Sequence, residues 1–330
     1  MANKQKSSPA LGMGHKLAYA LPALSLAIVG IPVYVFIPKF YTDVVGVNII
    51  LVGYLLFGVR LFDAVTDPVI GYISDNTRTR FGRRQPYIAV GAVCLAVLLF
   101  LLFTPPVGLS QTMASLWFGI TLFLLFLFWT IVVVPYESLG PEIVSDYHER
   151  TVLFSWRDGF LILGTFIAAS SPELIRRALQ LPPGDAGERA KFLWLAIIYG
   201  PLVIACCWAC VMMIKERYDI NTTRQKESIY AWRSIFKNRP FVILLVSYTI
   251  AAIGNNLPAT LILYYVEYVL QTTGAEVFLA LYFITGILFL PLWVMVSKRL
   301  EKKNAWLASM AANTGAFFGV FFLGPGDSVL

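Results

Sequence analysis

Apolar residues form nine runs, each long enough for a helix to cross a bilayer. The runs cover residues 16–41, 48–74, 86–104, 114–141, 154–175, 192–214, 241–269, 275–297 and 305–324. About 20 apolar residues in a helix span the hydrocarbon core of a membrane. The pattern therefore predicts an all-α polytopic membrane protein with nine spans.

The positive charges separate to the two sides of these predicted spans. Of the 26 Lys and Arg residues, twenty fall on one side, five on the other, and Arg60 lies inside a span. Because Lys and Arg are enriched in cytoplasmic loops, the sequence predicts a cytoplasmic N-terminus in a cell membrane, such as a bacterial inner membrane. The net charge of +7 is then a signal of topology, and we expect the lipid bilayer but no nucleic acid as a partner.

Composition agrees with this class of protein. Of the residues in the chain, 58% are hydrophobic and only 14% are charged, whereas about a quarter of the residues in soluble proteins are charged. The four cysteines lie inside apolar runs, which predicts free thiols rather than disulfides. With two histidines in the chain and no set of residues typical of a metal or nucleophile centre, we expect no cofactor and no enzyme activity.

The second predicted span carries three charged residues, Arg60, Asp63 and Asp67. Each charge inside a membrane helix costs about 2.5 to 3.5 kcal/mol. At 100° per residue the three share one helix face, which must contact protein or a water-filled cavity. Two negative charges and one positive charge leave room for a bound cation or a proton. A structural alternative is an Arg60–Asp63 ion pair with Asp67 bonded to a hydroxyl group.

The polar interval 215–239 divides the chain. We expect an N-terminal six-helix bundle over 1–214, a cytoplasmic linker over 215–239 and an incomplete second bundle over 240–330. A faint internal repeat, offset by about 223 residues, is typical of secondary transporters. Three spans in the second half favour a fragment about three helices short, with a genuine nine-span protein as the alternative.

Three motifs together resemble one family: FYTDVVG (40–46), RLFDAVTDPVIG (60–71) and RTRFGRRQP (78–86). They are similar to the melibiose carrier branch of the major facilitator superfamily, the glycoside–pentoside–hexuronide:cation symporters. The resemblance covers residues 16 to about 160 well and the rest by architecture. It implies the major facilitator fold, here a six-helix bundle plus the first three helices of the second. It also implies a monomer that moves a small organic solute with Na⁺ or H⁺ by alternating access.

The resemblance further implies a cation site made of oxygen-bearing side chains. Its members here are Asp63, Asp67, Thr66 and Thr130. Two carboxylates with further oxygen ligands suit Na⁺, and they can equally share a proton. Thr66 stands where the melibiose carrier has an asparagine, which leaves the choice of ion open. No other metal is expected.

The sugar-binding acids of the melibiose carrier are missing, because the first span has no acid and Val133 stands at one of the fourth-span positions. We still expect a sugar or glycoside as substrate, recognised by a different set of residues. Candidate cavity residues are polar or aromatic side chains within spans: Tyr34, Arg60, Trp129, Glu137, Trp156, Arg157, Asn255 and Asn256. Glu137 can instead pair with Arg157, and the two asparagines can serve as contacts between helices.

The basic loop after the second span predicts an inner gate. Its candidate members are Gly71, Asp75, Arg78, Arg80, Gly82, Arg83 and Arg84. Gly71 is expected to permit close helix approach, and Asp75 to accept hydrogen bonds from the arginines. The alternative is that the arginines only mark the cytoplasmic side. Two other functions stay open, a lysolipid-type symporter and a non-transporting membrane scaffold or sensor on the same fold.

Overall fold

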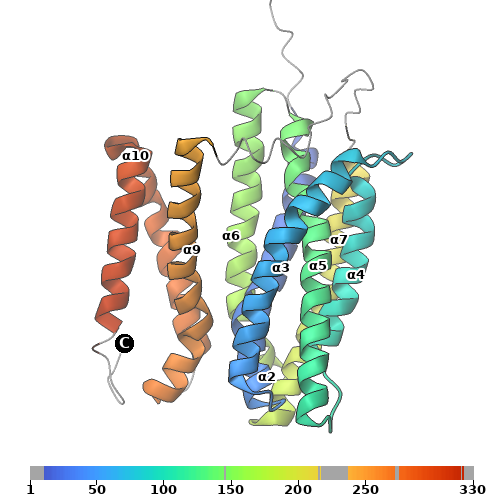
Figure 1. Cartoon of the computed structure of the whole chain (residues 1–330), viewed down its shortest axis with the longest axis vertical. Coiled ribbons are helices and arrows are strands. Elements are labelled where there is room, and N and C mark those ends of the chain that lie inside the picture. Colours follow the sequence, from blue (N-terminus) through green and yellow to red (C-terminus); the bar gives the residue numbers. More distant parts are fainter. Residues whose placement is uncertain are drawn as a thin grey trace, which may run out of the picture. The chain divides into compact units, whose positions relative to one another are not determined.

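The computed structural model describes residues 11–144, 146–214, 216, 237–271, 275–320 and 322. The chain divides into two compact units, Met1–Tyr218 and Asp219–Leu330. All the regular secondary-structure elements of the described residues are helices (Figure 1). Most of the predicted linker 215–239 lies outside the described residues.

The first unit holds the helices that the apolar pattern predicts between residues 16 and 214. In the described part of the chain, six helical segments are long and apolar enough to cross a membrane. The first span is built of α1 (Met13–Ile31), η1 (Pro32–Phe36) and α2 (Ile37–Asp43). The others are α3 (Ile49–Asn76), α4 (Gln85–Phe103), α5 (Gln111–Ile143), α6 (Tyr147–Ala178) and α7 (Asp185–Met213). The prediction of an all-α polytopic membrane protein is thus confirmed.

Proline changes the helical geometry of the first span. The π-helical turn η1 begins at Pro32, whose ring removes one backbone donor and crowds the preceding turn. Pro38 lies at the beginning of α2, which continues directly from η1, so its missing N–H group leaves the preceding turn one donor short. The polypeptide therefore passes Tyr34, a candidate cavity residue, in a widened turn between two α-helical segments.

The most extensive helix–helix contacts of this unit link neighbours in a row: α3 packs on α5, α5 on α4, α4 on α7, α7 on α1, and α1 on α6. Helices α3 and α6 thus stand at the two ends of the packing order. In the most apolar stretch of α3 only 11% of the residues are buried, against 50% in that of α4. The helix that carries the three charged residues is therefore the most open of the six.

Tyrosine hydroxyl groups tie neighbouring helices together. Tyr41 donates a hydrogen bond of 2.8 Å to the carbonyl oxygen of Leu102, and Tyr136 donates one of 2.7 Å to that of Tyr19. Both phenol rings are buried. In a bilayer, such bonds between helices add to close packing in holding the bundle together.

Gly164 lets α6 approach α1 closely. A Cβ atom at this position would collide with the carbonyl oxygen of Leu24 and lie 3.0 Å from Cβ of Ala27. Small residues at such crossings allow membrane helices to pack backbone against backbone. The tight α1–α6 contact therefore depends on glycine at this position.

The second unit contains α9 (Arg239–Tyr264), η2 (Tyr265–Val269) and α10 (Ala275–Val320). The sequence predicts two separate spans over 275–297 and 305–324, whereas helical structure continues through the basic segment between them. That segment, KRLEKKN (298–304), contains no proline or glycine and consists mostly of strong helix formers. The polar segment therefore keeps a helical backbone, and Figure 1 shows α10 turning back within its length, as two spans require.

Candidate functional site

Two charged residues of the α3 face form an ion pair. Arg60 Nη1 lies 3.6 Å from Asp63 Oδ2, and the Asp63 side chain is 18% exposed. The structural pairing that the sequence allows is thus present. It occupies only one carboxylate oxygen, because Asp63 Oδ1 is buried and has no hydrogen-bond partner among the described residues. A buried carboxylate oxygen without a donor fits a cation ligand or a protonated acid.

Aromatic side chains from other helices hold the guanidinium group of Arg60. Its Nη1 atom donates a hydrogen bond of 3.1 Å to the Tyr34 hydroxyl group. The same guanidinium group lies 4.3 Å from the ring centroid of Tyr34 and 5.7 Å from that of Phe126. This cation–π support from η1 and α5 fixes the positive charge on one side of the α3 carboxylates.

The second carboxylate is bound to α5. Thr130 Oγ1 donates a hydrogen bond of 2.9 Å to Asp67 Oδ1, and Thr130 is only 2% exposed. The structure thus brings together two of the four predicted cation ligands from different helices, and it also forms the hydroxyl bond to Asp67 that the structural alternative requires. Thr66 differs, because its hydroxyl group donates along its own helix to the carbonyl oxygen of Phe62 at 3.0 Å.

The alternative pairing of Glu137 with Arg157 is not formed. Arg157 Nη2 instead lies 2.8 Å from Asp158 Oδ1, and its guanidinium group stacks over the ring of Phe154 at 4.7 Å. Glu137 is exposed on α5. The adjacent aspartate is the nearer partner, so the α5 carboxylate stays open to the surface of the unit.

The remaining cavity candidates occupy different surroundings. Trp129 packs on α1, where a Cβ atom at Gly30 would lie 3.3 Å from the indole ring. Trp156 makes an edge contact with Phe160 on its own helix, with ring centroids 6.3 Å apart. Asn255 and Asn256 fall within α9, but their side chains lie outside the described residues.

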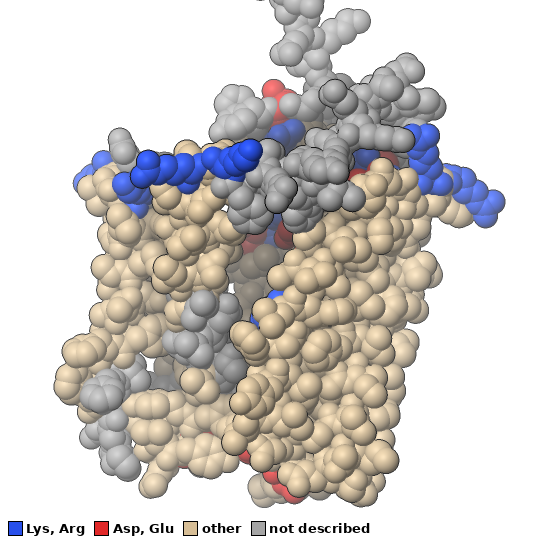
Figure 2. Space-filling view, viewed as in Figure 1, with Lys and Arg blue, Asp and Glu red and all other residues tan. Residues whose placement is uncertain are grey.

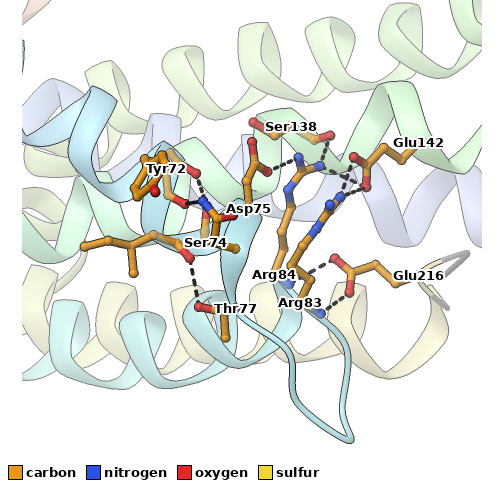
Figure 3. Close-up of polar contacts among 12 residues, drawn as sticks. Tyr72, Ser74, Asp75, Thr77, Arg83, Arg84, Ser138, Glu142 and Glu216 are labelled. Atoms are coloured by element: carbon orange, nitrogen blue, oxygen red, sulfur yellow. Dashed lines mark hydrogen bonds and ion pairs between the residues drawn. The ribbon is translucent and has the colours of Figure 1, made fainter. Parts of the chain in front are cut away.

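At the end of α3 a second charged network joins three helices (Figure 3). The side chain of Arg84, at the start of α4, is only 4% exposed. It lies 2.5 Å from Asp75 Oδ1 of α3 and 3.1 Å from Glu142 Oε2 of α5, and it also donates to the carbonyl oxygen of Ser138. Arg83 Nη2 contacts both oxygens of Glu142, at 2.5 and 2.7 Å. The interaction expected of Asp75 with an arginine of the loop is therefore present.

The other loop candidates do not enter this network. Arg80 is exposed and its guanidinium group lies 4.6 Å from the ring centroid of Phe81, and Arg78 is also exposed. In Figure 2 lysine and arginine side chains project at this end of the first unit, beyond a surface that carries almost no charged side chains in this view. Gly82 has a φ angle of +109°, a conformation that favours glycine.

Gly71 does not have the packing role expected of it. A Cβ atom at this position would lie 3.6 Å from Val134 Cγ1, which is an ordinary van der Waals distance. The spacing between α3 and α5 therefore leaves room for a larger residue at this point.

Three residues of the network were missed in the sequence: Ser138, Glu142 and Glu216. Glu142 comes directly after the fourth predicted span, and an acid beside a basic loop was the available signal. Ser138 contributes a backbone carbonyl oxygen, which no sequence pattern marks. Glu216 follows α7 and accepts hydrogen bonds from the backbone of Arg83 and Arg84.

Comparison with known proteins agrees with this architecture. Residues 18–330 match the family described as MFS/sugar transport protein. The putative glycoside/cation symporter YagG of Escherichia coli is 28% identical over 79% of this chain and 56% of its own length. The inner membrane symporter YicJ of the same organism is 30% identical over 83% of this chain and 58% of its own length. The isoprimeverose transporter of Lactiplantibacillus pentosus is 26% identical over 88% of this chain.

The chain thus spans little more than half the length of the two Escherichia coli relatives. The family match nevertheless covers both units, and the paired carboxylates of α3 and the basic loop lie within it. The chain therefore belongs to the major facilitator superfamily, to the sugar-transport branch that holds the glycoside–pentoside–hexuronide:cation symporters.

Proposed function

We propose that this protein is a secondary transporter that moves a sugar or glycoside together with Na⁺ or H⁺ by alternating access. The observation that carries the proposal is the pair of carboxylates on α3. Asp63 keeps a buried oxygen without a hydrogen-bond donor among the described residues, and Asp67 is oriented by Thr130 of α5. An apolar helix that retains two such acids marks an ion or proton pathway.

The ion would be held by oxygen atoms of the first unit. Carboxylate oxygens of Asp63 and Asp67 supply the charge, and the hydroxyl oxygen of Thr130 keeps a free lone pair after donating its proton. Such hard oxygen ligands suit Na⁺ as well as a shared proton. Arg60 reduces the net negative charge of the site, which favours one monovalent ion over a divalent one.

The solute class is proposed from the relatives. One is named a putative glycoside/cation symporter and another an isoprimeverose transporter. The exposed Glu137 of α5 and the aromatic Trp129 and Trp156 are the proposed contacts, because sugars bind carboxylates through hydroxyl groups and indoles through their apolar faces. We further propose that the N-terminus is cytoplasmic, from the distribution of Lys and Arg.

Thermal unfolding of the purified protein in Na⁺, Li⁺ and choline salts at several pH values tests the cation site. A ligand bound only by the folded state at a hundredfold excess over Kd stabilises it by about 2.7 kcal/mol. We expect stabilisation by Na⁺, or stabilisation on acidification without a Na⁺ effect, that Asp63→Asn and Asp67→Asn both abolish. Equal stability in all salts and at all pH values, in the wild type and both variants, would exclude cation coupling. Uptake of labelled glycosides into proteoliposomes under the same ion gradient then tests the solute.

A further inference from the structure

The first residues after α7 are held against the beginning of α4. Glu216 Oε1 accepts a hydrogen bond of 2.9 Å from the backbone N–H group of Arg84, and Glu216 Oε2 accepts one from that of Arg83. Two residues earlier, the carbonyl oxygen of Ile214 accepts a hydrogen bond from the Gln85 side chain. The chain that leaves α7 is therefore attached to the α4 terminus at two points.

The beginning of α4 is shaped to accept this carboxylate. Arg84 is the N-cap residue of α4 and Arg83 precedes it, so their backbone N–H groups lie just outside the helix, next to its positively polarised N-terminus, where a negative charge is favoured. Gly82 has a φ angle of +109°, and a Cβ atom at this position would collide with Glu216 Oε2. Glu216 also lines a pocket of about 730 Å³, together with the positively charged Arg78 and Arg80. Geometry and charge thus both favour Glu216 in this position.

The two arginines that Glu216 holds by their backbone extend their side chains to other carboxylates. Arg83 and Arg84 reach Glu142 on α5, and Arg84 also reaches Asp75 on α3. Figure 3 shows Glu216 near the backbone of the arginine pair, with Glu142 and Asp75 at the far ends of the side chains. The same two residues therefore connect α3, α5 and the chain leaving α7.

We propose that Glu216 is a positioning residue for this charge network. By fixing the backbone of Arg83 and Arg84, it aims their guanidinium groups at Asp75 and Glu142. It thereby couples the chain leaving α7 to the charged ends of α3 and α5. A change that pulls Glu216 away frees the start of α4 and loosens the arginine contacts, and loss of Glu142 loosens the attachment of Glu216. This coupling goes beyond the proposed transport function, and its test needs no transport assay.

A double-mutant cycle measures the coupling between Glu216 and Glu142. Glu216→Gln, Glu142→Gln and the double variant of the full chain are purified in detergent and their Tm values compared. Because both carboxylates act through the same arginines, the loss in the double variant should differ from the sum of the single losses by about 2 °C or more. Additive losses would overturn the proposal. Glu173→Gln is the matched control, since Glu173 also binds two arginines, Arg176 and Arg177, on α6. Its effect should add to that of Glu216→Gln.

Trypsin gives an independent readout of the attachment, because Lys215 and Arg217 flank Glu216 in the sequence. Glu142→Gln and Gln85→Leu leave these cleavage sites unchanged. Each should raise the rate of cleavage after residues 215 and 217 by about fivefold, because the attached segment opens more often. The Glu173→Gln variant should be cleaved by trypsin at the wild-type rate. A wild-type rate in Glu142→Gln would show that the two carboxylates are not coupled and would overturn the proposal.

Discussion

Thr130 and Asp67 join α5 to α3 through a hydrogen bond of 2.9 Å between a buried hydroxyl group and an exposed carboxylate. The bond fixes one carboxylate oxygen of Asp67 and leaves the other to a ligand. It also means that a change in the position of α3 against α5 alters the ligand geometry. The proposed cation site is therefore sensitive to the packing of these two helices.

Replacing Thr130 with valine should weaken both the fold and the cation response. The substitution keeps the volume of the side chain but removes the donor to Asp67, at a cost of about 1 kcal/mol. The Tm increase caused by the coupling ion should fall as well, because one oxygen ligand is lost. Thermal unfolding with and without the ion measures both effects.

Thr121→Val is the matched control for this substitution. Thr121 is also buried in α5, but its hydroxyl group donates to the carbonyl oxygen of Trp117 in its own helix. Its removal should leave the response to the ion unchanged. A loss of that response in Thr121→Val would assign the effect to α5 packing rather than to the site.

Replacing Arg60 with glutamine should strengthen cation binding while it lowers the stability of the cation-free protein. The arginine lies 3.6 Å from Asp63, so its positive charge opposes a bound cation. Its loss leaves two carboxylates without a fixed counter-charge on this helix face. We expect the Kd of the ion to fall by about tenfold or more, equivalent to about 1.4 kcal/mol. Isothermal titration or the ion dependence of Tm measures the change.

Tyr34→Phe distinguishes the effect of the Arg60 charge from the effect of the hydrogen bond that holds its side chain in place. It removes the hydrogen bond to the guanidinium group and keeps the ring beneath it. The change in Kd should then be much smaller than in Arg60→Gln. Equal effects of the two substitutions would show that the position of Arg60, rather than its charge, controls the site.

Arg84→Gln should be the most destabilising change in the basic loop. The Arg84 side chain is 4% exposed and binds groups on α3 and α5, whereas Arg80 is exposed and contacts a ring of the loop. Because Asp75 and Glu142 are themselves partly exposed, solvent screens part of the loss. We expect a cost of about 1 to 3 kcal/mol for Arg84→Gln and less than about 0.5 kcal/mol for Arg80→Gln. Equilibrium unfolding of the two variants compares them directly.

Glycines of the first unit should differ sharply in their tolerance of alanine. Gly164→Ala places a methyl group against the backbone of Leu24 and should separate α6 from α1, lowering Tm by several degrees. On the same helix, a Cβ atom at Gly159 would contact no neighbouring group within 4 Å, so Gly159→Ala should be neutral or stabilising. Gly71→Ala should also be tolerated. A large loss of Tm in Gly71→Ala would restore the close-packing role first expected of that residue.

The six spans of the first unit and the charged face of α3 could be predicted from the sequence alone. Both follow from local properties, because an apolar run of fixed length and a period of 3.6 residues act within one segment. The same reasoning separated 275–297 from 305–324, whereas helix-forming residues between them continue α10. A helical backbone in this segment does not contradict two spans, because α10 turns back within its length (Figure 1).

The partner of each charged group, by contrast, depends on how the helices pack. Arg157 binds the adjacent Asp158 rather than Glu137, and Thr66 bonds within its own helix. Glu216 reaches the start of α4 although more than 130 residues separate them in sequence. Such contacts depend on how helices pack and where a chain leaves its helix, and a linear pattern holds no distance between segments. The positions of the charges were therefore readable in the sequence, while their pairing was set by the packing of the bundle.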